Sequence, residues 1–189
     1  MYVRKITAVI AVLTLFLCAS CAGLEREVEE INLHYRNLPD DFLKFDLTAT
    51  TEERCDMYSM VFSYNKDDKS YVSFLAPESL RDINAYFEKD DPTVRYSRDF
   101  LQVPGLYGSD ITPCGAPYLL MNAWRNLAPY EYGYNDLFAG RNILIVYREN
   151  AVEYRTVFNR LNFDPISAEI YFNDKLIIEI NYIPVNDQT

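Results

Sequence analysis

Histidine, tryptophan and glycine are scarce in this chain of 189 residues, which has one histidine, one tryptophan and six glycines. The single histidine, His34, would need partners from distant parts of the chain to form a Ser-His-Asp or Cys-His arrangement. The sequence has no H-E-x-x-H pattern for zinc and no P-loop or G-x-G-x-x-G pattern for phosphate. We therefore predict no catalytic residue, metal or cofactor, and an enzyme is the least favoured class.

Basic residues are also in short supply. The 18 Lys and Arg residues are outnumbered by 28 Asp and Glu residues, which gives a formal net charge of −10 at pH 7. An acidic surface of this kind is repelled by the phosphates of nucleic acid and by anionic lipid headgroups. We expect no nucleic-acid partner, and we expect attachment to a membrane to come from a lipid rather than from surface charge.

The chain opens with a short uncharged run that is too brief to span a membrane. Arg4 and Lys5 precede about a dozen apolar or small residues, from Ile6 to Leu17, whereas a membrane-spanning helix needs roughly 20. A basic start followed by a short apolar core is typical of a secretory signal peptide. The protein is therefore expected to be exported.

Two cysteines, Cys18 and Cys21, end this run in the sequence LFLCASCAG. The small residues before Cys21 resemble the bacterial lipobox, whose cysteine is diacylated and becomes the mature N-terminus. We predict that residues 1–20 are a cleaved signal peptide and that lipid on Cys21 anchors a single domain, residues 21–189, to the outer face of the bacterial cytoplasmic membrane. The alternatives are plain signal cleavage nearby and a redox or metal pair, which would need a folded scaffold.

Two further cysteines, Cys55 and Cys114, lie outside the signal. In an exported protein they can form a disulfide with each other. Two free thiols and an intermolecular bridge are the alternatives, and the sequence leaves the choice open. Cys114 would have a reactive thiolate if it lay at the N-terminus of a helix.

The mature chain begins with a helical pattern and continues with strands. Apolar residues recur every three or four positions from Leu24 to Leu38, and Pro39 ends the pattern, which predicts an amphipathic helix. From Phe42 onward the period is two, as in a strand with one wet face. Short polar turns between successive strands indicate antiparallel hairpins. The predicted strands are residues 42–50, 55–64, 70–75, 83–88, 93–100, 142–148, 152–159, 168–172 and 176–183.

The strand pattern breaks between residues 101 and 140, where five of the six glycines lie. Apolar residues at helical spacing around Trp124 predict a second helix, with prolines on both sides that supply its start and stop. Two apolar segments, residues 100–108 and 129–138, flank it as predicted loops. Such loops form a lid, form a contact surface, or pack against the sheet edge.

The second helix and the loop before it supply the predicted ligand-binding residues. A helix under a curved sheet either fills the core as a plug or forms one wall of a ligand cavity, and the two roles can coexist. The predicted wall residues are Leu106, Tyr107, Leu120, Met121, Trp124 and Leu127.

Two stretches of the chain resemble elements of the LolA/LolB-like lipoprotein-carrier superfamily, in its Gram-positive lipoprotein branch. Residues 71–88, YVSFLAPESLRDINAYFE, are similar to the family's strand, APE-L, strand element. Residues 163–186, FDPISAEIYFNDKLIIEINYIPVN, are similar to its closing FDP, hairpin, strand element. The two predicted helices also occur in the order that the family shows.

The resemblance implies an α+β fold. We expect a half-open, strongly curved antiparallel sheet of about 9–11 strands, an incomplete barrel, with helices covering its concave face. In transport members of the superfamily this concavity receives acyl chains. In a lipid-anchored spore-germination branch (GerS-like), the same fold is the protein partner of a cell-wall amidase.

These features support two hypotheses of function. The first is a lipid-anchored, non-catalytic extracytoplasmic protein that holds an acyl chain or another apolar ligand and takes part in lipoprotein or envelope-lipid handling. The second is an interaction module that docks an exported cell-wall enzyme, or a second copy of itself, through a sheet edge or the Tyr-rich loop. A continuous apolar cavity of roughly several hundred Å³ favours the first, and a filled barrel with an exposed apolar patch favours the second.

Overall fold

The computed structural model describes residues 23–89, 91, 93–97, 105–135 and 142–184. Within them the chain forms two α-helices, two short 3₁₀ helices and one sheet. The first helix is described over residues 23–37, and α2 spans Ala116–Asn126. None of the described helices is long and apolar enough to cross a membrane. The 3₁₀ helices are η1 (Glu78–Leu80) and η2 (Leu106–Gly108). The strands are β1 (Asp40–Thr50), β2 (Cys55–Asn65), β3 (Ser70–Ala76), β4 (Asn84–Phe87), β5 (Arg95–Tyr96), β6 (Pro129–Asn135), β7 (Asn142–Glu149), β8 (Val152–Phe158), β9 (Pro165–Phe172) and β10 (Lys175–Ile183).

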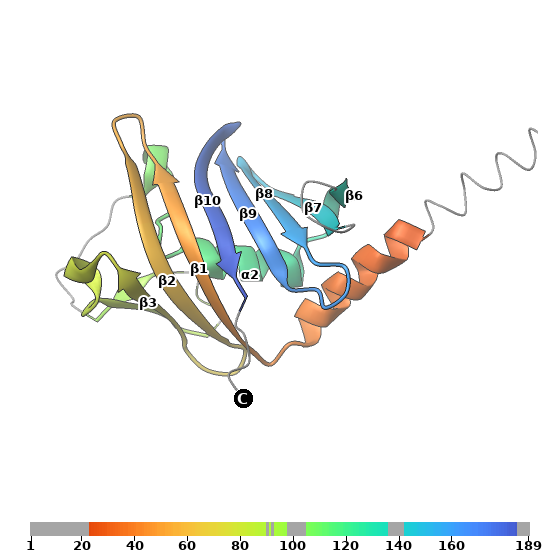
Figure 1. Ribbon diagram of the computed structural model, residues 1–189, viewed down its shortest axis with the longest axis horizontal. Helices are drawn as coiled ribbons and strands as arrows, with labels where there is room; N and C mark the ends of the chain where they lie inside the picture. The colour runs from red at the N-terminus through yellow and green to blue at the C-terminus, as the bar shows by residue number, and fades with distance from the viewer. Residues whose placement is uncertain (1–22, 90, 92, 98–104, 136–141, 185–189) are drawn as a thin grey trace, which may run out of the picture.

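All ten strands belong to one antiparallel sheet with the order β5-β4-β3-β2-β1-β10-β9-β8-β7-β6. Two five-strand meanders therefore meet where β1 pairs with β10, and α2 connects them (Figure 1). The outer strands, β5 and β6, do not pair with each other, so the sheet is not closed into a barrel. The predicted α+β fold with an open antiparallel sheet is confirmed.

The alternation of side chains along β1 explains which face of the sheet is buried. Leu43, Phe45 and Leu47 are buried, and the intervening Asp46 is exposed. Phe45 stands opposite Met60 of β2 and Tyr182 of β10. Because register carries this alternation from strand to strand, one face of the sheet becomes a continuous apolar surface.

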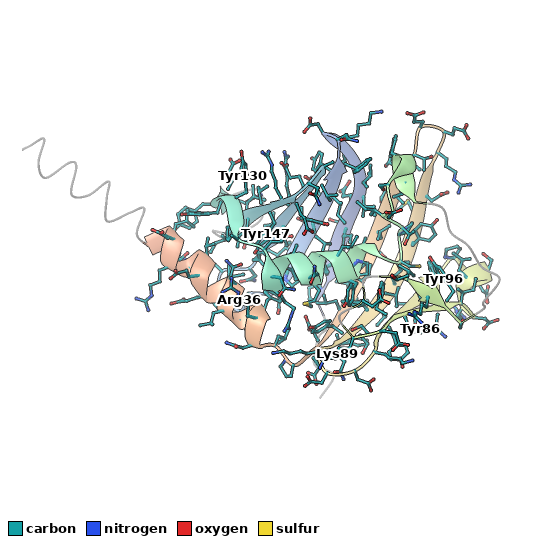
Figure 2. The ribbon with its side chains drawn as sticks, turned by 180° about the vertical axis from the view of Figure 1, so that it is seen from behind. Arg36, Tyr86, Lys89, Tyr96, Tyr130 and Tyr147 are labelled. Carbon is teal, nitrogen blue, oxygen red and sulfur yellow. The ribbon has the colours of Figure 1, made fainter. Side chains whose placement is uncertain are left out.

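Both helices pack against that apolar face. The first helix contributes Tyr35, whose ring lies 4.9 Å from the ring of Trp124 on α2 and 5.5 Å from that of Phe158 on β8. The Trp124 indole N–H donates a hydrogen bond of 2.9 Å to the hydroxyl of Thr156, also on β8. Figure 2 shows α2 lying across this face of the sheet with the first helix beside its C-terminal end.

Two arginines join the ends of the helices. The guanidinium of Arg125, which is only 8% exposed, donates to the carbonyls of Tyr35 (2.8 Å), Arg36 (3.1 Å) and Leu38 (2.7 Å). In return, Nε of Arg36 donates to the carbonyl of Arg125 at 3.2 Å. The last carbonyls of a helix have no partner within that helix. Each arginine therefore caps the C-terminal end of the other helix.

The loop predicted over residues 129–138 is wrong in its first part, where the structure has β6. Every second residue here is a tyrosine, at positions 130, 132 and 134, as in a strand. Pro129 and Gly133, however, are typical of a loop, and the prediction followed them. Residues 129–135 form a strand because they pair with β7. Tertiary context of this kind overrides a weak local preference for a loop.

The strand predicted over residues 93–100 is reduced to β5, Arg95–Tyr96. Residues 98–100 of that prediction lie outside the described residues, as do residues 136–138 of the predicted loop.

Candidate ligand-binding site

A groove of about 810 Å³ lies beside the N-terminal end of α2. It is bounded by residues 93–96, residues 108–115, α2, and the ends of β8 and β9. Its volume is within the range of small-molecule sites. The apolar side chains of its wall are Val94, Ile111, Leu119, Val152 and Phe172, and its other members are Thr93, Tyr96, Gly108, Ser109, Asp110, Thr112, Gly115 and Tyr154.

The hydroxyl of Tyr96 is the distinctive polar group of this groove. It is buried and makes no hydrogen bond of good geometry within the described residues, although the side chains of Thr112 and Cys114 lie near it, and burial raises the pKa of Tyr96 well above its ordinary value. Burial likewise raises the pKa of Tyr154 to about 12. Both phenols are therefore neutral at physiological pH. A buried hydroxyl that lacks a well-formed hydrogen bond is costly, so the groove favours a ligand that brings a polar group to Tyr96.

A compact turn positions the loop side of the groove. The Leu106 amide donates to the Ile111 carbonyl (2.8 Å), and the Ser109 hydroxyl donates to the Leu106 carbonyl (2.6 Å). At Gly105, a Cβ atom would lie 1.6 Å from the Ser109 carbonyl oxygen, so no larger residue fits there. The turn holds Ile111 and the residues after it against the start of α2.

The six predicted wall residues do not line this groove. Leu120, Met121 and Trp124 are at most 1% exposed, and Leu106 is also buried in the core. Leu127 is half-buried against that core. In the structure these five residues lie in the hydrophobic core or pack against it. This arrangement agrees with a core plug, one of the two roles considered for α2. Their contact with a ligand stays a prediction.

Tyr107 lies instead on a neighbouring groove of about 600 Å³, with Arg54 and Lys175. Gly108 and Phe172 line both grooves, so the two are adjacent. Tyr107 is therefore close to the site without being part of its wall.

Leu119 is the residue of α2 that sequence reasoning missed. It immediately precedes the buried Leu120, and successive residues of an α-helix point about 100° apart. Its position could be found only once the buried stripe of α2 was known. Val152 and Phe172 are at strand ends, where no local pattern distinguishes a groove residue from any other half-buried one.

Cys55 and Cys114 are both free thiols in the structure. Cys55 is exposed at the start of β2, whereas Cys114 is buried just before α2. Burial raises the pKa of the Cys114 thiol to about 12. The reactive thiolate that a helix N-terminus would favour is therefore disfavoured at Cys114.

We expect the two thiols to react with iodoacetamide at very different rates. In residues 22–189 at pH 8, Cys55 should be alkylated within minutes, and Cys114 should be modified at least a hundredfold more slowly because its thiolate is rare and buried. Peptide mass spectrometry measures both rates in one sample. In 6 M guanidinium chloride, the control condition, both cysteines should react equally. Equal rates without denaturant would contradict the burial of Cys114.

Several predicted features cannot be placed. Cys21 and residues 1–20 lie outside the described residues.

His34 is exposed on the first helix, and its ring lies 5.8 Å from that of Phe163. Among the described residues, no group of three or more His, Cys, Asp or Glu side chains is arranged to hold a metal ion.

Comparison with known proteins gives structural likenesses at low similarity. No family model matches the chain, and no curated protein matches it. A LolA superfamily protein, NE2245 from Nitrosomonas europaea, is similar with 12% identity and a TM-score of 0.39, over 85% of this chain and 91% of that chain. A putative outer membrane lipoprotein-sorting protein domain from Vibrio parahaemolyticus has 9% identity and a TM-score of 0.38, over 85% and 92%. A DUF1329 family protein from Desulfovibrio piger has 12% identity and a TM-score of 0.40, over 86% and 90%.

Likenesses at these TM-scores assign the chain to no family. Membership of the LolA/LolB-like superfamily, and of its Gram-positive or GerS-like branch, stays a prediction from the sequence.

Proposed function

We propose that this protein is a non-catalytic binding protein that holds an amphiphile, an apolar chain with a polar end, in the groove beside α2. One observation carries the proposal: a groove of about 810 Å³, whose wall includes five apolar side chains, contains the buried hydroxyl of Tyr96, which makes no hydrogen bond of good geometry within the described residues. The apolar chain would lie along Leu119 and Phe172. The polar end would exchange a hydrogen bond with Tyr96, which lies beyond the N-terminal end of α2 in Figure 2.

The setting of this binding protein is part of the same proposal. Residues 1–20 are removed on export, and lipid on Cys21 holds residues 21–189, a single domain, on the outer face of the bacterial cytoplasmic membrane. The two helices cover the concave face of the open sheet. The ligand is then an acyl chain or a similar group that becomes available during lipoprotein or envelope-lipid handling.

A fluorescent fatty acid, cis-parinaric acid, tests the proposal. It should bind residues 22–189 saturably. Leu119→Glu, which places a charge on the groove wall, should weaken binding at least tenfold. The matched control is Leu33→Glu on the first helix, where the side chain is already 58% exposed, and binding should not change. Circular dichroism checks that both variants are folded.

Tyr96→Phe sharpens the test because it removes only the hydroxyl. Tyr96→Phe should weaken binding of the fatty acid about fivefold, the equivalent of one hydrogen bond. It should leave unchanged the binding of a hydrocarbon of the same chain length that lacks the carboxyl group. Absence of saturable binding, or equal binding by wild type and Leu119→Glu, would contradict the groove as a ligand site.

A second function is favoured by a separate observation at the sheet edge. On edge strand β6, Tyr130, Tyr132 and Tyr134 are 61%, 39% and 41% exposed. An exposed edge with large side chains can pair with a strand of another protein. If no apolar ligand binds, docking of an exported cell-wall enzyme or a second copy of the chain at β6 becomes the preferred function. Native mass spectrometry of the protein purified from its host separates a bound lipid from a bound protein.

A further inference from the structure

A second pocket, of about 560 Å³, lies on a different face of α2 from Leu119. Tyr118, Asn122 and Arg125 follow one another at spacings of four and three residues, so they share one helix face. The pocket is completed by the end of β2, by the turn between β2 and β3, and by the residue that follows Glu88. Its full lining is Tyr64, Lys66, Asp67, Lys89, Tyr118, Asn122, Arg125 and Asn126.

The pocket is basic in an acidic protein. Lys66, Lys89 and Arg125 face a single acid, Asp67, which is 3.6 Å from the ammonium of Lys89. The local charge is therefore +2, while the whole chain carries a formal charge of −10. Like charges that line one pocket favour the binding of an anion there.

Arg125 is the buried member of this group. It is 8% exposed, and its contacts are the carbonyls of the first helix and the ring of Tyr64 at 5.1 Å. Among the described residues, no carboxylate lies within ion-pair distance of Arg125 or of Lys66. The carbonyls at the helix end stabilise the guanidinium but carry no net charge, so its positive charge adds to the potential of the pocket. Three of the five N–H donors of Arg125 bond to these carbonyls.

We propose that this pocket binds a phosphoryl group. A phosphate monoester carries a charge of about −1.5 to −2 at pH 7 and presents three acceptor oxygens, which matches the local charge of +2. The ammonium groups of Lys66 and Lys89 and the side-chain amide of Asn122, whose oxygen already accepts a bond of 2.6 Å from Asn126, would supply the hydrogen bonds, with the charge of Arg125 beside them. Figure 2 shows Lys89 below α2, whereas Tyr96 lies beyond the end of the helix. The pocket is therefore separate from the apolar groove, and the inference does not rest on the proposed function.

Titration with inorganic phosphate at pH 7.5 and constant ionic strength tests this inference. Isothermal calorimetry should detect saturable binding of phosphate and none of chloride. In Lys66→Gln/Lys89→Gln, the affinity for phosphate should fall at least tenfold; both side chains are exposed, so the fold should be kept. The matched control is Lys44→Gln/Lys175→Gln, which removes the same charge elsewhere and should leave the affinity unchanged. Absence of saturable phosphate binding, or the same affinity in Lys66→Gln/Lys89→Gln as in wild type, would overturn the proposal.

Two esters identify the source of the phosphoryl group. Glycerol 3-phosphate and dihexanoyl phosphatidic acid carry the same headgroup chemistry, and both should lose affinity in Lys66→Gln/Lys89→Gln. At least tenfold tighter binding of the lipid supports a phospholipid headgroup as the occupant, and equal binding supports a soluble phosphate ester. Leu119→Glu should bind phosphate as wild type does, so failure of the apolar groove and failure of this pocket give different results.

Discussion

Replacing Arg125 with methionine should lower the free energy of unfolding by about 4 kcal/mol. The side chain is 8% exposed, and its guanidinium bonds to three carbonyls at the end of the first helix, with donor–acceptor distances of 2.7 to 3.1 Å. Hydrogen bonds that involve a charged group contribute about 1.5–3 kcal/mol each, and carbonyls left unpaired lose most of that. Methionine has a similar length but donates nothing. Urea unfolding of residues 22–189, followed by circular dichroism, measures the change.

Two further arginine variants show whether the cap causes the loss. Arg125→Lys keeps the charge, but one ammonium cannot reproduce the planar fork that reaches three carbonyls. It should therefore cost about 2 kcal/mol. Arg81→Met is the exposed control: its ion pair with Glu78, at 3.8 Å, is worth less than about 1 kcal/mol. If Arg125→Met costs no more than Arg81→Met, the bonds between the helix ends do not stabilise the fold.

The buried face of the first helix could be predicted from the sequence, whereas the hydrogen bonds between the two helix ends could not. Apolar spacing predicted that Val28, Ile31 and Tyr35 face the core, and all three are buried, because the helix period is a local property. The bond from Arg125 to the Tyr35 carbonyl joins residues 90 positions apart. No pattern in the sequence distinguishes that arginine from one at the surface, since long-range partners are decided by the assembled sheet.

The strands could likewise be predicted from local patterns, whereas the groove could not. Along β1, residues that alternate in sequence alternate in burial, so strand and buried face were both predictable. The groove draws Val94, Leu119 and Phe172 from three distant segments, and each is an ordinary half-buried residue in its own element. Their common role appears only when β1 pairs with β10 and the two meanders become one sheet. The prediction of α2 was correct, and the contact of its buried stripe with a ligand stays a prediction.

Trp124→Ala should destabilise the protein by about 4 kcal/mol. The indole is 1% exposed and contacts the rings of Tyr35, Phe158 and Tyr182, at centroid distances of 4.9, 5.4 and 6.2 Å. Truncation of a buried aromatic residue to alanine typically costs 3–5 kcal/mol, because the surrounding side chains collapse only partly into the space. Urea unfolding measures the loss. Leu33→Ala, at an exposed position on the first helix, should change stability by less than about 0.5 kcal/mol.

A double-mutant cycle separates the packing of Trp124 from its hydrogen bond. Trp124→Phe removes the indole N–H and leaves the Thr156 hydroxyl, which is fully buried, without its donor. It should cost about 3 kcal/mol, of which about 1 kcal/mol should be recovered in Trp124→Phe/Thr156→Val, because an apolar pair leaves no polar group unpaired. No recovery in the double variant would mean that packing alone accounts for the loss.

Ligand affinity in Trp124→Phe then distinguishes the two roles of α2. A core plug predicts that cis-parinaric acid binds Trp124→Phe and wild type equally, since the groove wall at Leu119 is intact. A ligand wall predicts weaker binding in Trp124→Phe and no change in Leu119→Glu. The burial of Trp124 and the position of Leu119 on the groove favour the first result. The second would mean that the ligand enters between α2 and the sheet, where the described side chains are now in contact.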